Sequence, residues 1–164
     1  MKPSFADFKR PPLVDMIIVE TPTQFVTNVH NAIYDGADAF GFQMERLKPE
    51  FRTEETLTKM FSHLGDRPLY ITNYRGAYNH EMTEKARLDE LKLALRCGAS
   101  LIDITGDTFD PVPGELTKNP TAIEKQKKFI DEVHEMGGQV LMSSHIFRFL
   151  PEEEVLAVAL EQQS

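Results

Sequence analysis

Five short apolar segments, each followed by a segment whose apolar residues recur at helical spacing, constrain the fold of this chain most strongly. The apolar segments are residues 14–20, 39–44, 68–72, 101–105 and 140–144, and the helical segments are residues 21–35, 53–64, 83–98, 121–136 and 151–162. Thr21 and Pro22 form a typical helix start, and Gly36 and Gly65 end two of the helical segments. Strands that alternate with helices in this way predict a parallel sheet with right-handed crossovers.

Two α/β architectures use such units. A flavodoxin-like open parallel sheet is complete with five units, whereas a (β/α)8 barrel, the TIM barrel, needs eight and is typically about 250 residues long. The chain has 164 residues, so the pattern alone favours the open sheet. In either case we expect one domain over residues 1–164, with an irregular, proline-bearing lead-in over residues 1–12.

The charge balance and the cysteine content limit the partners and the compartment that fit this chain. Eighteen basic and 26 acidic residues give a formal net charge of -8. This argues against nucleic acid or an anionic membrane as the main partner, but it allows a basic pocket for a small anionic molecule. A single cysteine, Cys97, excludes an internal disulfide, and no apolar run reaches membrane-spanning length. The first residues lack a secretory signal, so the sequence predicts a cytoplasmic protein.

Each predicted strand leaves polar side chains at its carboxyl end, where α/β folds place their ligand-binding crevices. In chain order these side chains are Glu20, Gln43, Glu45, Thr72, Asn73, Arg75, Asp103, Thr105, Asp107, Ser143 and His145. Any one such residue is more often simply solvated. Five consecutive strand ends of this kind are nevertheless typical of an enzyme pocket.

Among these residues His145 is the strongest candidate for catalysis, because an imidazole can serve as both base and acid near neutral pH. Its alternative role is a capping histidine bonded to a loop carbonyl. Arg75 is a candidate carboxylate clamp through bidentate hydrogen bonds, or else a solvated loop arginine. Glu81, in the same loop, could orient His145 or cap the third helix. No glycine-rich turn of the phosphate-binding type is present, and we expect no cofactor.

Two further functions fit the same pattern. The first is a divalent-metal enzyme in which Glu20, Glu45, Asp103 and His145 supply oxygen and nitrogen ligands from different strands. The second is a non-catalytic, flavodoxin-like binding module, for which five units are sufficient. Metal dependence would distinguish the first from a metal-free enzyme.

Several motifs resemble those of type I 3-dehydroquinate dehydratases, the Schiff-base, barrel-fold lyases of the shikimate pathway in aromatic amino acid biosynthesis. They are Gly36-Ala37-Asp38, residues 68–72 with Arg75 nearby, residues 101–104, and above all residues 140–147 followed by Pro151. The resemblance implies a barrel-type chain with five βα units of a parent eight. It also implies that His145 removes a proton next to an iminium and returns it to the leaving hydroxyl of a cyclic hydroxy-keto acid. Arg75, Gln43, Thr72 and Ser143 would then contact a small carboxylate substrate, with Glu81 as a possible orienting acid.

The chain departs from the family at several of the positions that the resemblance picks out. Gly41 and Gln43 stand where the family has a glutamate and an arginine, and Tyr74 stands where it has a third-strand arginine, one position before Arg75. The expected Schiff-base lysine belongs to a sixth strand, and Lys48, Lys118 and Lys125 lie in loop or helix contexts instead. Five units also expose two edges of a barrel, which predicts a homo-oligomer or a further C-terminal segment.

Overall fold

The computed structural model of the chain describes residues 2–146 and 148–163, and these contain a five-stranded parallel sheet. The strands are β1 (Val14–Ile17), β2 (Ala39–Gln43), β3 (Leu69–Thr72), β4 (Leu101–Thr105) and β5 (Gln139–Ser143). They pair in the order β1-β2-β3-β4-β5, so each strand lies beside its neighbour in the sequence. β1 and β5 are therefore the two edges of the described sheet.

A helix follows every strand, as the sequence predicts. The α-helices are α1 (Pro22–Tyr34), α2 (Glu54–Phe61), α3 (Glu84–Arg96), α4 (Pro120–Glu135) and α5 (Glu152–Gln163). Short 3-10 turns occupy η1 (Phe5–Asp7), η2 (Met44–Arg46), η3 (Pro49–Phe51), η4 (Ser62–Leu64) and η5 (Ala77–Asn79). Thr21, Thr53, Thr83 and Asn119 cap the first four helices by accepting a backbone N–H. The predicted boundaries move by at most three residues: the first strand ends at Ile17 rather than at Glu20, and the second helix ends at Phe61 rather than at Leu64.

The hydrophobic core lies between the sheet and helices α1 to α4. Alternate strand residues, including Phe42, Ile71 and Ile102, point to this face and are fully buried. An aromatic cluster joins β2 to the first two helices, with the Phe42 ring centroid 5.0 Å from that of Phe25 and 6.3 Å from that of Phe61. Burial of these residues fixes which face of the sheet each helix covers.

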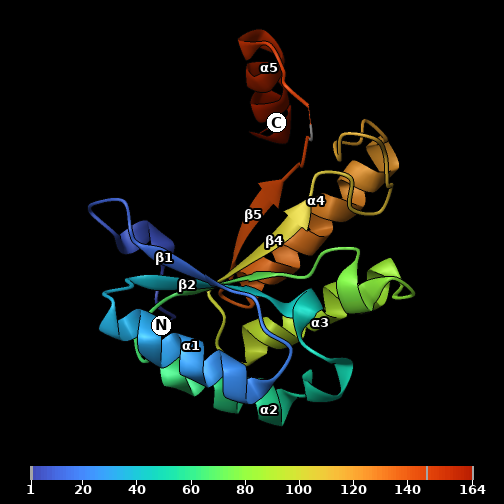
Figure 1. The fold of residues 1–164 in the computed structure, drawn as a ribbon. Coiled ribbons are helices and arrows are strands. Elements are labelled where there is room, and N and C mark those ends of the chain that lie inside the picture. Colours follow the sequence, from blue (N-terminus) through green and yellow to red (C-terminus); the bar gives the residue numbers. More distant parts are fainter. Residues whose placement is uncertain (1, 147, 164) are drawn as a thin grey trace.

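The opposite face of the sheet is concave and largely uncovered. Met16 lies opposite Gly41, and Gly41 lies opposite Tyr70, so these residues form a row across three strands. Met16 is 40% exposed and Leu141, on β5, is 43% exposed. In Figure 1, α1 to α4 all lie along one side of the twisted sheet, and none of these four crosses its concave side.

This topology identifies the fold class. A flavodoxin-like sheet reverses its strand order and carries helices on both faces, whereas a barrel adds each strand beside the last and keeps its helices outside. The sequential strand order and the one-sided helices are those of the barrel type, with five βα units. The barrel-type prediction is confirmed, and the open-sheet alternative, which the pattern alone favoured, is wrong.

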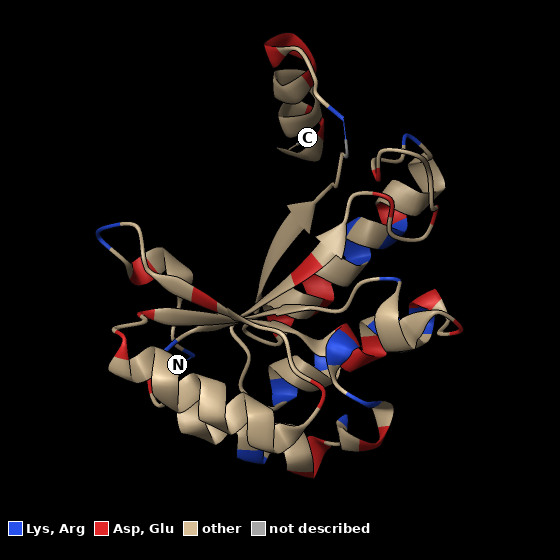
Figure 2. Ribbon diagram, viewed as in Figure 1, with Lys and Arg blue, Asp and Glu red and all other residues tan. Residues whose placement is uncertain are grey.

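The two ends of the chain pack differently. In the lead-in, Lys2 donates to the Leu95 carbonyl at 2.8 Å and Ser4 donates to Gln139 at 3.1 Å, so this segment is bound to the last turn of α3 and the first residue of β5. By contrast, no residue of α5 is buried. Figure 1 shows α5 standing clear of the other helices, and in Figure 2 the ribbon of its acidic first turn is red. In the described part of the chain, no helix has the length and apolar character needed to cross a membrane.

Candidate functional site

A buried carboxylate on the concave face forms the centre of the candidate site. Asp103 on β4 is 1% exposed, and its side chain accepts hydrogen bonds from three hydroxyl groups. Tyr70 donates at 2.9 Å, Ser143 donates at 2.8 Å, and Tyr74 makes the third bond. These donors come from β3, the loop after it and β5, so Asp103 links β4 to both neighbouring strands.

Burial changes the acid–base properties of this cluster. It raises the pKa of Asp103 against the opposing effect of the three hydroxyl donors. Burial also raises the pKa of Tyr74 to about 12 and that of Tyr70 still further. Both phenols therefore stay protonated at neutral pH and remain donors to Asp103.

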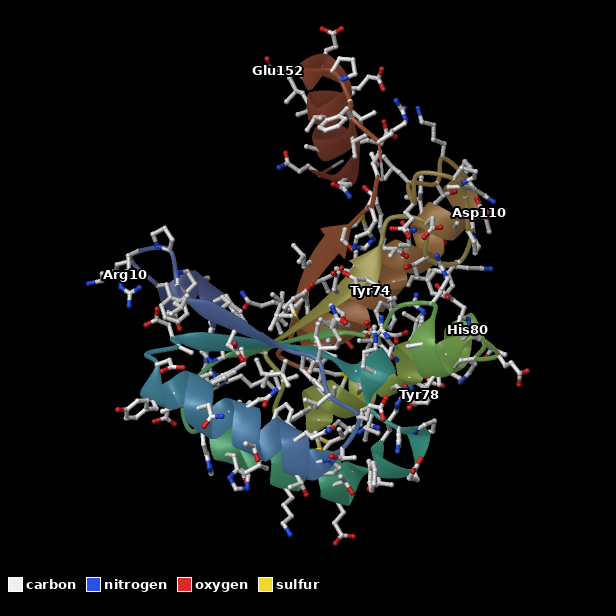
Figure 3. The ribbon with its side chains drawn as sticks, in the orientation of Figure 1. Arg10, Tyr74, Tyr78, His80, Asp110 and Glu152 are labelled. Carbon is white, nitrogen blue, oxygen red and sulfur yellow. The ribbon has the colours of Figure 1, made fainter. Side chains whose placement is uncertain are left out.

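His145 lies at the rim of the same cluster. Its Nδ1 is 2.5 Å from Oε2 of Glu115, and its ring meets the Tyr74 ring edge-on with centroids 4.8 Å apart. Glu115 belongs to the loop after β4, and Tyr74 to the loop after β3. In Figure 3, Tyr74 lies next to the end of β4, while His80 lies further out along the loop towards α3. The structure thus brings His145 to other strand ends, as the sequence predicts.

Arg75 does not have the free guanidinium that a substrate clamp needs. Its Nη1 donates to Asp107 at 2.8 Å, and its Nε and Nη2 donate to the two carboxylate oxygens of Glu84. These carboxylates raise the pKa of Arg75 against the lowering effect of burial. Because the planar donor fork already binds two protein carboxylates, a substrate carboxylate would have to displace one of them, and the role of Arg75 as a clamp stays a prediction.

The acid that contacts His145 is not Glu81, the residue that the sequence suggested for this role. Glu81 is exposed, and the carboxylate that contacts His145 belongs to Glu115. The reason is geometric: Glu81 lies just before α3, whereas the loop after β4 returns to the sheet and carries Glu115 to the end of β5. Sequence reasoning missed Glu115 because it lies in a Pro- and Gly-containing loop with no periodic signal.

The remaining predicted substrate contacts have mixed positions. Ser143 donates to Asp103, and Thr72 is 2% exposed and donates to Glu45 at 3.0 Å. Gln43 lies in register with Thr72, half-buried at the end of β2. The hydroxyls of Thr72 and Ser143 therefore donate to carboxylates of the protein itself. The contact of Gln43 with a substrate stays a prediction.

The four predicted metal ligands do not converge. The Glu45 carboxylate accepts hydrogen bonds from the Thr72 hydroxyl and the backbone N–H of Tyr74, and Asp103 accepts from its three hydroxyl donors. Within residues 2–146 and 148–163, no three His, Cys, Asp or Glu side chains are grouped closely enough to hold a metal ion. The ligand set proposed for a metal enzyme is therefore wrong.

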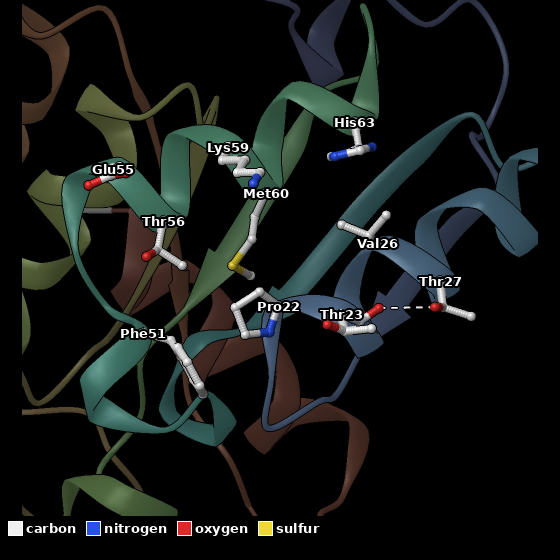
Figure 4. A pocket seen from close by; sticks show the side chains of 10 residues that line it. All are labelled: Pro22, Thr23, Val26, Thr27, Phe51, Glu55, Thr56, Lys59, Met60 and His63. Carbon is white, nitrogen blue, oxygen red and sulfur yellow. Dashed lines mark hydrogen bonds between the residues drawn. The ribbon is translucent and has the colours of Figure 1, made fainter.

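A separate hollow of about 500 Å³ lies between α1 and α2. Figure 4 shows its lining, which includes Val26, Phe51, Lys59, Met60 and His63. None of the residues around His145 contributes to it. It lies on the helical side of the sheet, so we place the candidate site at Asp103 and His145 instead.

The raised pKa of Asp103 predicts a pH effect on stability. Between the ordinary aspartate pKa near 3.8 and the raised value in the folded state, the folded chain binds more protons than the unfolded chain. The free energy of unfolding should therefore fall as pH rises through this interval. Asp103→Asn should remove that fall. Urea unfolding of both proteins over a series of pH values tests this, and parallel pH profiles would contradict it.

Fold and site together define a barrel-type α/β chain of the kind found in enzymes, with polar side chains converging at the ends of its strands.

Three similar solved structures are 3-dehydroquinate dehydratases. The Enterococcus faecalis structure has 20% identity and a TM-score of 0.65, and it matches 93% of this chain and 61% of its own. The Geobacillus kaustophilus structure has 13% identity and a TM-score of 0.72, and it matches 94% of this chain and 58% of its own. The type I enzyme of Clostridium difficile has 17% identity and a TM-score of 0.71, and it matches 96% of this chain and 60% of its own.

These similarities show the fold alone, because the identities are low. The chain spans about three-fifths of the length of the three dehydratases. No protein-family model matches the chain, and no curated protein matches it in sequence.

Proposed function

We propose that these five units supply the proton-transfer machinery of a carbon–oxygen lyase similar to type I 3-dehydroquinate dehydratases. The observation that carries the proposal is the position of His145, held by Glu115 through Nδ1 and set against Tyr74 where three strands end. The fold shared with three such dehydratases supports it. Under this proposal the chain acts on a cyclic hydroxy ketone of the shikimate pathway in the cytoplasm.

The chemistry assigns one task to His145. A primary amine condenses with the substrate ketone, and the resulting iminium accepts electrons when the adjacent carbon loses a proton. His145 Nε2 takes that proton and then returns it to the hydroxyl on the next carbon, which leaves as water. Hydrolysis of the conjugated iminium releases the enone and regenerates the amine.

The amine is not supplied by a strand end of this chain. Among the described residues, no lysine directly follows one of the five strands. We propose that it comes from an element that pairs with the free edge of β1 or β5, in a further segment or in a second copy of the chain. With Arg75 bound to Asp107 and Glu84, a substrate carboxylate would also find its partner on such an element.

A small exogenous amine tests the proposal without that element. In the presence of ethylamine, the chain should accelerate formation of the enone from 3-dehydroquinate, measured by ultraviolet absorbance. The rate should exceed the sum of the rates with amine alone and with protein alone, and it should saturate with 3-dehydroquinate. A rate equal to that sum at every substrate concentration would contradict the proposal.

A further inference from the structure

The loop after β4 presents one carboxylate oxygen to both the backbone N–H and the ring Nδ1 of His145. Oε2 of Glu115 accepts from the backbone N–H of His145 at 2.9 Å and lies 2.5 Å from its Nδ1. An ionised carboxylate only accepts hydrogen bonds, so the ring nitrogen that it contacts must carry the proton. The neutral imidazole then has its lone pair on Nε2, facing away from Glu115.

We infer that Glu115 is the positioning residue of His145, which fixes the Nδ1–H tautomer and leaves Nε2 as the atom that takes up a proton. This assignment rests on the proposed function for its catalytic meaning, but the tautomer itself is a property of the free protein. The Tyr74 ring limits rotation of the imidazole from a second side, through the edge-on contact at 4.8 Å. Glu115 thus performs the role that the sequence assigned to Glu81.

The backbone of the loop holds Glu115 in place. Leu116 forms a parallel bridge with Gly106 at the end of β4, and the N–H of Thr117 donates to the Gly106 carbonyl at 3.1 Å. Glu115 itself has φ +52°, in the left-handed region that a glutamate rarely adopts. Such a conformation persists only where the surroundings determine it, and here it directs the carboxylate to His145.

Gly106 is the residue that permits this close approach. A Cβ at Gly106 would lie 2.8 Å from the backbone oxygen of Glu115 and 2.9 Å from a side-chain carbon of Leu116. Since a backbone atom cannot give way cheaply, an alanine there should displace the loop. Gly106→Ala therefore moves Glu115 without altering the chemistry of either Glu115 or His145.

Nitrogen-15 NMR of the histidine rings tests the inference in the intact chain without any substrate. At a pH where the His145 ring is neutral, the wild-type protein should show a protonated Nδ1 and an unprotonated Nε2. Glu115→Gln replaces the acceptor with an amide that can also donate, so a mixture containing the Nε2–H tautomer is expected. Gly106→Ala should give the same mixture, and Glu81→Gln should leave the wild-type pattern unchanged. Assignment uses the resonances that disappear in His145→Ala.

The outcomes separate this inference from the proposed function. An Nε2–H tautomer in the wild type, or an unchanged pattern in both Glu115→Gln and Gly106→Ala, would overturn the positioning role. A shift in Glu115→Gln alone would support the side-chain contact and reject the role of Gly106. If the tautomers behave as expected and the amine-dependent dehydration is absent, the positioning role stands and the proposed reaction is wrong.

Discussion

Replacing His145 with alanine is expected to lower the protein-dependent, amine-assisted dehydration of 3-dehydroquinate by about 100- to 10,000-fold, the usual contribution of a positioned acid–base group. The imidazole both removes the proton next to the iminium and returns it to the leaving hydroxyl, so its loss affects both halves of the reaction. The Tyr74 hydroxyl donates to Asp103, and burial raises its pKa to about 12. Tyr74 therefore stays protonated at neutral pH and is a poor substitute base. The measurement is the initial rate of enone formation at saturating substrate and amine.

A matched histidine variant gives the control. His80 is exposed and lies in the loop between β3 and α3, away from Tyr74, whose ring contacts His145 (Figure 3). His80→Ala should keep the wild-type rate. If His145→Ala retained full protein-dependent activity, the proton-shuttle role of His145 would be refuted, whatever the effect of His80→Ala.

The largest effect on stability is expected at Phe42. Its side chain is fully buried on the helical face of β2, in edge contact with Phe25 and Phe61. Truncation to alanine removes the ring contacts and leaves a cavity, so Phe42→Ala should lower the free energy of unfolding by about 3–5 kcal/mol. Urea titration followed by circular dichroism measures this change.

Tyr34 offers an aromatic control on a neighbouring element. It ends α1 and is 91% exposed, so Tyr34→Ala should change the free energy of unfolding by less than about 0.5 kcal/mol. Equal destabilisation by the two substitutions would mean that the aromatic cluster is not the centre of the core.

The sequence predicts the elements of this fold better than their arrangement. Apolar runs and helix caps such as Thr21 and Thr53 are local signals, and the structure confirms them. Whether the helices cover one face or two depends on strand order, which the same alternation of strand and helix leaves open. The polar side chains at the strand ends and, above all, the resemblance of residues 140–147 to a barrel family favour the observed topology.

The site shows the same limit at the level of single side chains. His145 could be predicted because it directly follows an apolar strand. The fate of Arg75 could not, since Asp107 lies 32 residues away and is brought to it by the adjacent strand end. The role of Glu115 could not be predicted for a similar reason, because its contact with His145 spans 30 residues and depends on a left-handed backbone conformation at Glu115.

The uncovered concave side of the sheet has a consequence for the strength of the electrostatics at His145. Bulk solvent reaches the imidazole and Glu115, whose side chains are 35% and 30% exposed, so the electrostatic interaction between the two groups is weakened by water. At 4 Å, a pair of unit charges is worth about 1 kcal/mol in water and about 4 kcal/mol at an effective dielectric constant near 20. A wall of additional strands would expel this hydration and strengthen, several-fold, the attraction between Glu115 and the imidazolium that forms when Nε2 takes up a proton, with no change in either residue.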